Sequence, residues 1–229
     1  MNLSESVREN DTATVVYVGC GAKKQASPAP ARDLYTSAYF GKKREYAEAV
    51  GDSWAILSAL YGSVDPTSRA RPYDVTIDDY PLDVDERPRA EYATVDEWAA
   101  AFVEGVENSI HNRERWEGWQ PLGRVEVLAG RKYVDPIREG LDALADEHGF
   151  EAVYPFDDTE GIGEQIGWLT ERIEAAEEQD TGGSAGPTVD TGDVEADRGT
   201  TPGEDTDATG DDGPRQVDLA GFGSRDSGK

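Results

Sequence analysis

Residues 15–20, Val-Val-Tyr-Val-Gly-Cys, form a continuous apolar run that ends in glycine and cysteine. A short run without polar alternation is typical of a strand that is buried on both faces of a sheet. Similar runs occur at residues 54–59, 125–129 and 152–156. Segments of helical character separate these runs, so the sequence predicts right-handed crossovers and a mostly parallel sheet of about four strands.

Four segments have the spacing and the termini of helices, at residues 36–50, 94–110, 133–148 and 162–178. The second is the clearest, because Thr94 and Glu97 have the spacing of a capping box and apolar residues then recur at helical intervals. Helices on both faces of the sheet would give an α/β fold of the three-layer sandwich type.

The sequence predicts one α/β domain over residues 12–178 and an acidic tail over residues 179–229. Gly, Thr, Asp, Pro and Ser dominate the tail, a composition that predicts disorder because little can be buried there. Near its end, residues 216–223 resemble a sliding-clamp-binding peptide. Its Gln216, Leu219 and Phe222 have the spacing of such a peptide, whose apolar side chains enter a groove. A chance match explains the same spacing, so the clamp partner is a hypothesis.

Acidic residues outnumber basic ones 48 to 22, which gives a formal net charge of -26. Such an excess suits a protein that must stay hydrated in concentrated salt, and it need not imply a basic partner. The sequence shows neither a run long enough to cross a bilayer nor a signal peptide. We therefore expect a cytoplasmic protein that does not enter a membrane.

Charge is distributed unevenly along the chain. Between residues 20 and 71, eight basic side chains accompany five acidic ones, a net +3 that leaves -29 for the rest. A positive region in so acidic a protein would attract phosphate, which suggests a nucleotide or a nucleic-acid backbone as the ligand. Pairing of these bases with neighbouring acids is the alternative explanation.

The composition limits cofactor and metal chemistry. With one cysteine and two histidines, the chain cannot form an internal disulfide or a Cys/His zinc site. Gly19, Cys20 and Gly21 resemble the start of a dinucleotide-binding fingerprint, but its third glycine is missing and a proline-containing loop follows. The sequence therefore predicts no cofactor and no metal.

Ligands of open α/β sheets bind outside the carboxyl ends of the strands, and polar residues follow several predicted strands here. Cys20 comes at such an end beside two lysines, a setting that favours a reactive thiol, although burial would make the same cysteine inert. Asp33, Asp65 and Asp74 lie in loops on this side and are candidates for acid, base or water-positioning roles. Turn capping is the alternative role for all three.

Six short motifs occur in order along the chain, namely VGCGAKK, PARDLYTSAYF, ILSALYGSVDP, RPYDVT, LAGRKYVDPI and IGEQIGWL. Together they resemble an uncharacterised domain family of archaea, bacteria and phages over residues 15–169. The block at residues 56–76 is also similar to the YaaA peroxide-stress family, which is associated with DNA binding, although Asp74 stands where that family has arginine. More distantly, this block resembles the uracil-DNA-glycosylase-like domain of archaeosine-synthesis enzymes.

These resemblances imply an α/β sandwich that handles bases or nucleotides. They point to a pocket made of Cys20, Lys23, Asp33, Tyr35, Ser58, Tyr61, Gly62, Pro66, Tyr73 and Asp74. The predicted catalytic residues are Cys20, Asp33 and Asp74. The predicted ligand-binding residues are Gly19, Gly21, Lys23, Lys24, Tyr35, Ser58, Tyr61, Gly62, Arg71, Tyr73, Gly130 and Tyr133. Tyrosines would stack on a base while Lys23 and Arg71 hold phosphate, and core packing is the alternative for each tyrosine.

Three functions agree with the sequence. The first is a base- or nucleotide-handling protein that acts on or near nucleic acid, of a glycosylase-like, modification or repair type. The second is a stress protein that binds nucleic acid without catalysis. The third is an enzyme that acts on a small phosphorylated metabolite. Whether the protein is an enzyme therefore stays open at this level.

Overall fold

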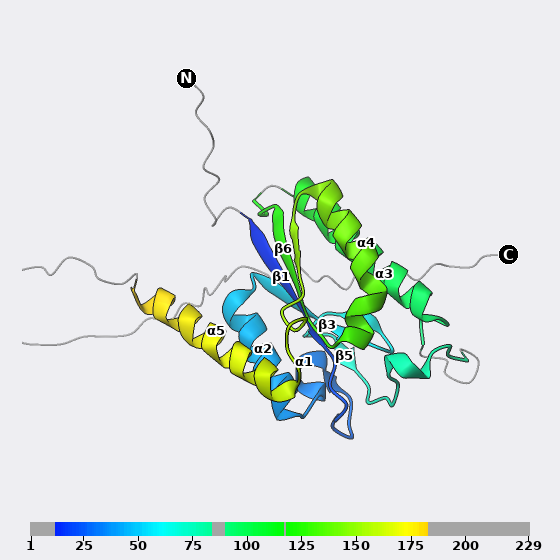
Figure 1. Ribbon diagram of the computed structural model, residues 1–229. Coiled ribbons are helices and arrows are strands. Elements are labelled where there is room, and N and C mark those ends of the chain that lie inside the picture. Colours follow the sequence, from blue (N-terminus) through cyan, green and yellow to red (C-terminus); the bar gives the residue numbers. More distant parts are fainter. Residues whose placement is uncertain (1–11, 84–89, 117, 183–229) are drawn as a thin grey trace, which may run out of the picture.

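A five-stranded sheet forms the centre of the computed structural model, which describes residues 12–83, 90–116 and 118–182 (Figure 1). The strand order is β4-β3-β1-β6-β7, in which β4 alone is antiparallel to its neighbour. The strands are β1 (Ala13–Gly19), β3 (Ser53–Ser58), β4 (Gly62–Val64), β6 (Leu122–Leu128) and β7 (Glu151–Val153). The predicted mostly parallel α/β sheet is confirmed, with one strand more than expected.

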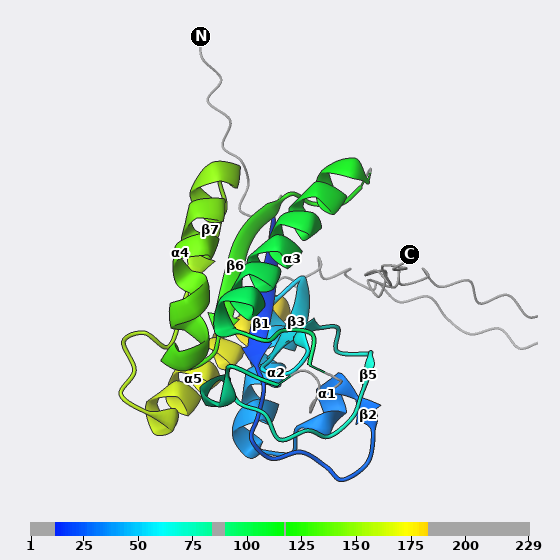
Figure 2. The ribbon, with the colours of Figure 1, turned by 90° about the vertical axis from the view of Figure 1, so that its right-hand side faces the viewer.

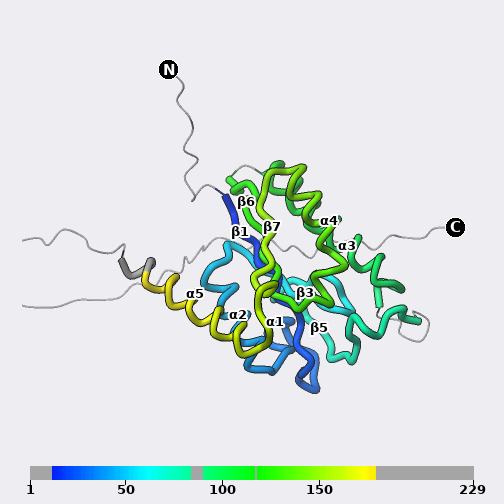
Figure 3. Tube along the Cα trace, viewed as in Figure 1, coloured from blue at the N-terminus to red at the C-terminus, as the bar shows by residue number. Residues whose placement is uncertain are grey.

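Two pairs of helices cover the two faces of this sheet. Alternate residues of β1 explain the arrangement, because Val15 and Tyr17 belong to one apolar core and Val16 and Val18 to the other. The first core contains α3 (Val95–Arg115) and α4 (Arg131–His148), and the second contains α2 (Ala38–Val50) and α5 (Ile162–Gly182). Figures 1 and 3 show α2 and α5 together on one side of the sheet. The result is the three-layer sandwich that the sequence predicts.

Local capping defines the start of α3. The hydroxyl of Thr94 accepts a hydrogen bond from the backbone N–H of Glu97 at 3.1 Å, as the motif predicts. The carboxylate of Glu97 accepts from the N–H of Ala93 at 2.8 Å, one residue before the position that a capping box uses. The helix then buries Trp98 and Phe102, so its apolar periodicity does mark the face that packs on the sheet.

The long segment after β3 is more ordered than the sequence suggests. Besides β4, it forms β5 (Arg69–Ala70), which pairs with β2 (Ala29–Pro30), and a short 3-10 helix, η1 (Ile77–Asp79). The four-residue helix α1 (Ala31–Leu34) follows β2, and Figure 2 shows α1, β2 and β5 close together. Elements of two to four residues are too short to show periodicity, which explains why the sequence reads as loop here.

The last helix extends beyond residue 178, the predicted end of the domain. Helix α5 continues to Gly182, four residues into the segment predicted as tail. The rest of that segment, including Gln216, Leu219 and Phe222 of the proposed clamp-binding peptide, lies outside the described residues. Within the described part of the chain, no helix combines the length and the apolar character that crossing a membrane requires.

Candidate functional site

The carboxyl ends of β1, β3 and β6 meet at one edge of the sheet because these strands are parallel. Cys20 directly follows β1, and its backbone N–H donates to the carbonyl oxygen of Leu57 in β3 at 2.9 Å. Across from it, the first turn of α4 supplies Tyr133, whose hydroxyl lies 3.3 Å from the Cys20 Sγ atom. The thiol is therefore held between two strands and a helix start, and its residue is only partly buried.

A hydrogen-bonded row of hydroxyls lies close to this thiol. The Tyr73 hydroxyl is 2.8 Å from the Ser58 Oγ atom and 3.0 Å from the Tyr35 hydroxyl. Ser58 ends β3, whereas Tyr35 directly follows α1 and Tyr73 lies between β5 and η1. Segments that are distant in sequence thus bring their hydroxyls together at the strand ends.

Two lysines approach the same place. The ammonium group of Lys24 lies over the ring of Tyr73, 4.1 Å from its centroid, and 5.7 Å from that of Tyr35. Burial lowers the pKa of Lys24, while the neighbouring Cys20 and Asp74 favour its charged form. The charged group of Lys24 therefore lies close to two aromatic rings, those of Tyr35 and Tyr73.

Lys43 is the buried cation of the site, with 3% of its surface exposed. Its Nζ atom donates to the carbonyl oxygen of Gly19 at 2.6 Å and to that of Leu128 at 3.3 Å. The same atom lies 4.8 Å from the centroid of the Tyr39 ring. Burial lowers the pKa of Lys43 to about 8, and Cys20 partly opposes this change. Lys43 can therefore gain or lose a proton near neutral pH.

In the sequence, Lys43 is one of the eight basic residues of the positive region. Its position within the site was not predicted. A signal was present in the helical register, because Lys43 lies three residues from Phe40 and three from Tyr46. All three are on the buried face of α2. A lysine on an apolar helix face must find partners for its ammonium group, and here those partners are strand-end carbonyls.

Three tyrosines at the site have a raised pKa. Burial is the largest cause for Tyr35, Tyr73 and Tyr133, and the neighbouring Cys20 is the second. Their hydroxyls therefore stay protonated at neutral pH and act as hydrogen-bond donors and acceptors. We refer to the whole group as the Cys20 cluster: Cys20, Lys24, Tyr35, Lys43, Ser58, Tyr73 and Tyr133.

Other predicted ligand residues surround this cluster. Gly19 permits close packing of β1 on β6, since a Cβ atom there would lie 2.9 Å from the Cβ of Ala129. Gly21 lies close to Tyr35 and Ser37. The ring of Tyr61 meets that of Tyr73 edge-on at 5.3 Å.

The remaining predicted ligand positions are Lys23, Gly62, Arg71 and Gly130. Lys23 and Arg71 are exposed. Gly130 caps the start of α4 without a side chain. Gly62 opens β4 with a positive φ of 67°, and a Cβ atom there would collide with Tyr92. The positive φ and the close approach of Tyr92 are therefore sufficient to explain a glycine at position 62.

The three aspartates differ in their surroundings. Asp33 forms ion pairs with Arg32 and Arg44 on the exposed surface of α1 and α2. Asp65 caps a turn by accepting from the N–H of Thr67 at 2.7 Å, and the carbonyl of the next residue, Pro66, accepts from the N–H of Arg32. Asp74 is exposed and is the one aspartate among them that acts on the charge of Lys24.

Local ion pairs also occupy part of the positive region. Lys42 pairs with Glu45, and Arg44 pairs with Asp33 and Glu48. The alternative explanation from the sequence therefore holds for these bases. In the part of the chain that the structure describes, no carboxylate pairs with Lys23, Arg69 or Arg71.

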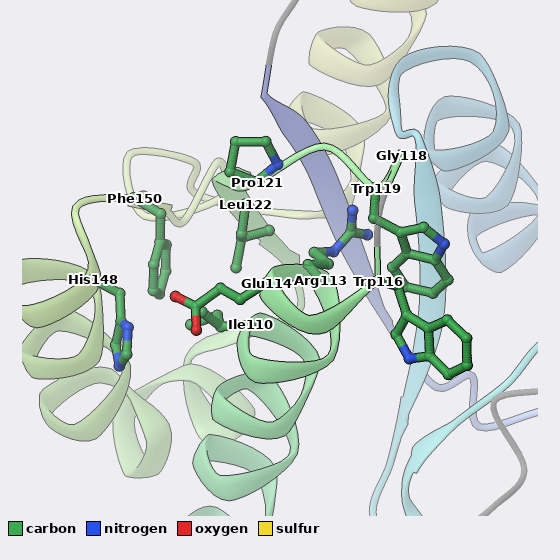
Figure 4. A pocket seen from close by; sticks show the side chains of 10 residues that line it. All are labelled: Ile110, Arg113, Glu114, Trp116, Gly118, Trp119, Pro121, Leu122, His148 and Phe150. Atoms are coloured by element: carbon green, nitrogen blue, oxygen red, sulfur yellow. The ribbon is translucent and has the colours of Figure 1, made fainter.

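A cavity of about 360 Å³ lies at the opposite edge of the sheet (Figure 4). Residues at the end of α3 and the start of β6 line it, together with His148 and Phe150. In Figure 4, Trp116 and Trp119 lie on one side of it and Phe150 on the other. This cavity contains none of the residues that the sequence singles out, so the Cys20 cluster remains the candidate functional site. Over residues 12–83, 90–116 and 118–182, no group of three or more His, Cys, Asp or Glu side chains is arranged to hold a metal ion.

Comparison with known proteins gives one family. No protein with a curated description and no solved structure matches the chain. Residues 15–171 match a family of unknown function, and they include every member of the Cys20 cluster. The matched range agrees with residues 15–169 of the motif series and covers more than half of the chain. The chain therefore belongs to the family of unknown function DUF6884.

Proposed function

We propose that this protein binds a nucleobase or nucleotide, free or within nucleic acid, at the Cys20 cluster and acts on the bound base. The observation that carries the proposal is the convergence of a thiol, two lysines and several hydroxyls at the carboxyl ends of β1, β3 and β6. This edge is where open α/β sheets bind their ligands.

The chemistry of the cluster suits a base and its phosphate. Tyr61 and Tyr73 offer aromatic surface at the rim, and both are only partly buried. Aromatic rings stack on bases without regard to sequence, whereas lysine and arginine attract the phosphates. Lys23 and Arg71 are exposed on the segments that lead into and out of the cluster. A ligand could thus place its base at the tyrosines and its phosphate outside.

The cluster also offers groups for a reaction. Cys20 is the nucleophile within it, and Lys43 has a pKa of about 8, suited to proton transfer near neutral pH. The protonated phenols of Tyr35 and Tyr133 can stabilise negative charge on a ligand oxygen. The resemblances to YaaA and to the uracil-DNA-glycosylase-like domain favour a nucleic acid as the source of the base.

The proposal is tested first by binding. The full chain is titrated against fluorescent single- and double-stranded DNA and RNA over a series of potassium chloride concentrations, starting from the lowest at which the protein stays folded. A variant with Lys23, Lys24 and Arg71 changed to alanine is compared with a control that loses the same charge elsewhere, at Lys42, Arg115 and Arg172. We expect the first variant to bind at least tenfold more weakly and the control to bind within about threefold of the wild type.

Catalysis is tested by release of free base from the same nucleic acids, measured by chromatography. The Cys20→Ala variant should bind with unchanged affinity and lose turnover. Equal binding by the two triple variants would contradict the proposed site. Binding without base release would leave the non-catalytic stress protein, and no binding at all would direct attention to small phosphorylated ligands.

A further inference from the structure

The hydrogen bonds at Ser58 fix the direction of the hydroxyl row. Its Oγ atom accepts from the backbone N–H groups of Leu60 at 3.2 Å and Tyr61 at 3.1 Å. These two bonds use both lone pairs of the hydroxyl oxygen. Ser58 is fully buried, so its own hydrogen must find an acceptor inside the protein. That acceptor is the Tyr73 oxygen at 2.8 Å.

The direction continues through Tyr73 to Tyr35. Because Tyr73 accepts from Ser58, its own hydrogen is free to be donated to the Tyr35 oxygen at 3.0 Å. The reverse order would give Ser58 a third donor and leave its buried hydrogen without an acceptor.

The row therefore ends at the hydrogen of Tyr35. Among the described residues, the Tyr73 hydroxyl is the one side-chain partner within 3.5 Å of the Tyr35 hydroxyl, and in that bond Tyr35 accepts. Only 6% of the surface of Tyr35 is exposed. A buried hydroxyl hydrogen that lacks an acceptor is costly, so it marks a place where a ligand can complete the bonding.

We propose that Tyr35 donates its phenolic hydrogen to an acceptor atom of the ligand bound beside Cys20. Cys20 acts electrostatically on Tyr35, and Tyr35 acts in the same way on Tyr133, so the three side chains lie near one another. The Cys20 and Tyr133 side chains are themselves in contact at 3.3 Å. Tyr35 is thus a specificity-determining residue that is orientated by Ser58 and Tyr73.

A hydrogen-bond donor at Tyr35 restricts the ligand further. That this ligand is a base rests on the proposed function. The acceptor must be a carbonyl oxygen or an unprotonated ring nitrogen, because an amino group can only donate to its surroundings. The site therefore prefers a base whose carbonyl edge faces Cys20. A group that becomes negatively charged at that oxygen during reaction would gain most from this preset donor.

The single cysteine of the chain makes a direct test possible. Iodoacetamide carries a carbonyl oxygen next to its reactive carbon, and allyl bromide is of similar size without such an acceptor. In each reaction the Cys20 thiolate attacks the methylene carbon. An S–C bond forms, the C–I or C–Br bond breaks, halide leaves, and the thiol proton passes to the buffer. Intact mass gives both rate constants on the full-length native protein.

The measured quantity is the ratio of the iodoacetamide rate constant to the allyl bromide rate constant. Any change in the amount of thiolate affects both reagents equally and cancels in this ratio. We expect Tyr35→Phe to lower the ratio about 3- to 10-fold, the effect of one lost hydrogen bond. Tyr154→Phe is the matched control, because its hydroxyl donates to the Asp142 carboxylate instead, at 2.8 Å. Its ratio should equal that of the wild type.

An unchanged ratio in Tyr35→Phe would overturn the inference. A Cys20 that reacts with neither reagent in the native protein would do the same, because the inference requires open space beside the thiol. These outcomes do not depend on nucleic-acid binding. If Tyr35→Phe leaves the rate ratio unchanged while the protein still binds nucleic acid, the role of Tyr35 as a donor is refuted and the proposed function stands. If the ratio falls but no nucleic acid binds, Tyr35 remains the donor and the nucleobase ligand is refuted.

Discussion

The Nζ atom of Lys43 lies 2.6 Å from the carbonyl oxygen of Gly19, so a buried ammonium of α2 is bound to the last residue of β1. Its second acceptor, the carbonyl of Leu128, ends the neighbouring strand β6. One charge therefore connects a helix to two strand ends directly beneath Cys20. The folded protein stabilises the protonated lysine less than water does, which makes its stability depend on pH.

Lys43→Met tests this dependence with a side chain of similar length and no charge. The folded-state pKa of about 8 is below the unfolded value of 10.5, so the unfolded chain binds more protons between these values. The unfolding free energy of the wild type, minus that of the variant, should rise with pH by up to about 1.4 kcal/mol per unit in this window. The total rise should be about 3 kcal/mol.

Urea unfolding at a series of pH values and constant salt measures this difference. Both proteins share the other titrating groups, so the subtraction isolates Lys43. A difference that stays flat through the window would show that Lys43 keeps its ordinary pKa in the folded protein.

Ser58→Ala should destabilise the protein by about 1–3 kcal/mol, because two backbone N–H groups and the Tyr73 hydroxyl lose their buried partner. Ser27→Ala removes an exposed hydroxyl and should change the unfolding free energy by less than about 0.5 kcal/mol. Urea unfolding of both variants supplies the comparison. Equal stability of the two would mean that water replaces the Ser58 hydroxyl.

Gly19→Ala should cost about 1–3 kcal/mol through overpacking, because the added methyl would lie 2.9 Å from the Cβ atom of Ala129. Gly41→Ala is the matched control inside α2, where the new methyl meets nothing within 4 Å. It should stabilise the protein by about 0.5–1 kcal/mol, since glycine is unfavourable within helices. Thermal unfolding should therefore shift in opposite directions, and a shift in the same direction would refute this account.

Arg124→Met should destabilise the protein by about 1–3 kcal/mol, a range reduced because the arginine is 40% exposed. The change leaves the buried Glu126 carboxylate with the Tyr46 hydroxyl, at 2.7 Å, as its remaining side-chain partner among the described residues. Changing Arg124 and Glu126 together to methionine should recover part of the loss.

Arg124 also pairs with the exposed Glu151, and Glu151→Gln should cost less than about 1 kcal/mol. A double variant no more stable than Arg124→Met would show that Glu126 is not the source of the loss.

The long elements were predictable because their patterns are strong. The run at residues 15–20 lies almost entirely on β1, and the helix predicted from Thr94 begins at Val95 with Thr94 as its cap. Strand β4 was not predicted, because three residues are too few to show an alternation of apolar and polar side chains. Its pairing with β3 also depends on the turn at Gly62. Tertiary contacts, not local propensity, make such short strands.

The candidate site was predictable to the extent that strand ends determine it. Cys20 and Ser58 each follow or end a predicted strand, and the parallel topology brings them to one edge. Tyr35 and Tyr73 come from loops, and resemblance to known families rather than spacing pointed to them. The helical register places Lys43 on the buried face of α2, but its two carbonyl partners depend on how α2 lies against β1 and β6.

The sheet begins and ends in strands of three residues, β4 and β7. Short outer strands present few unpaired backbone groups to the strands of another molecule. Concentrated salt screens the repulsion that a net charge of -26 would otherwise provide between copies of the chain. Under such conditions, resistance to edge-to-edge aggregation comes from the geometry of these two outer strands rather than from the acidic surface.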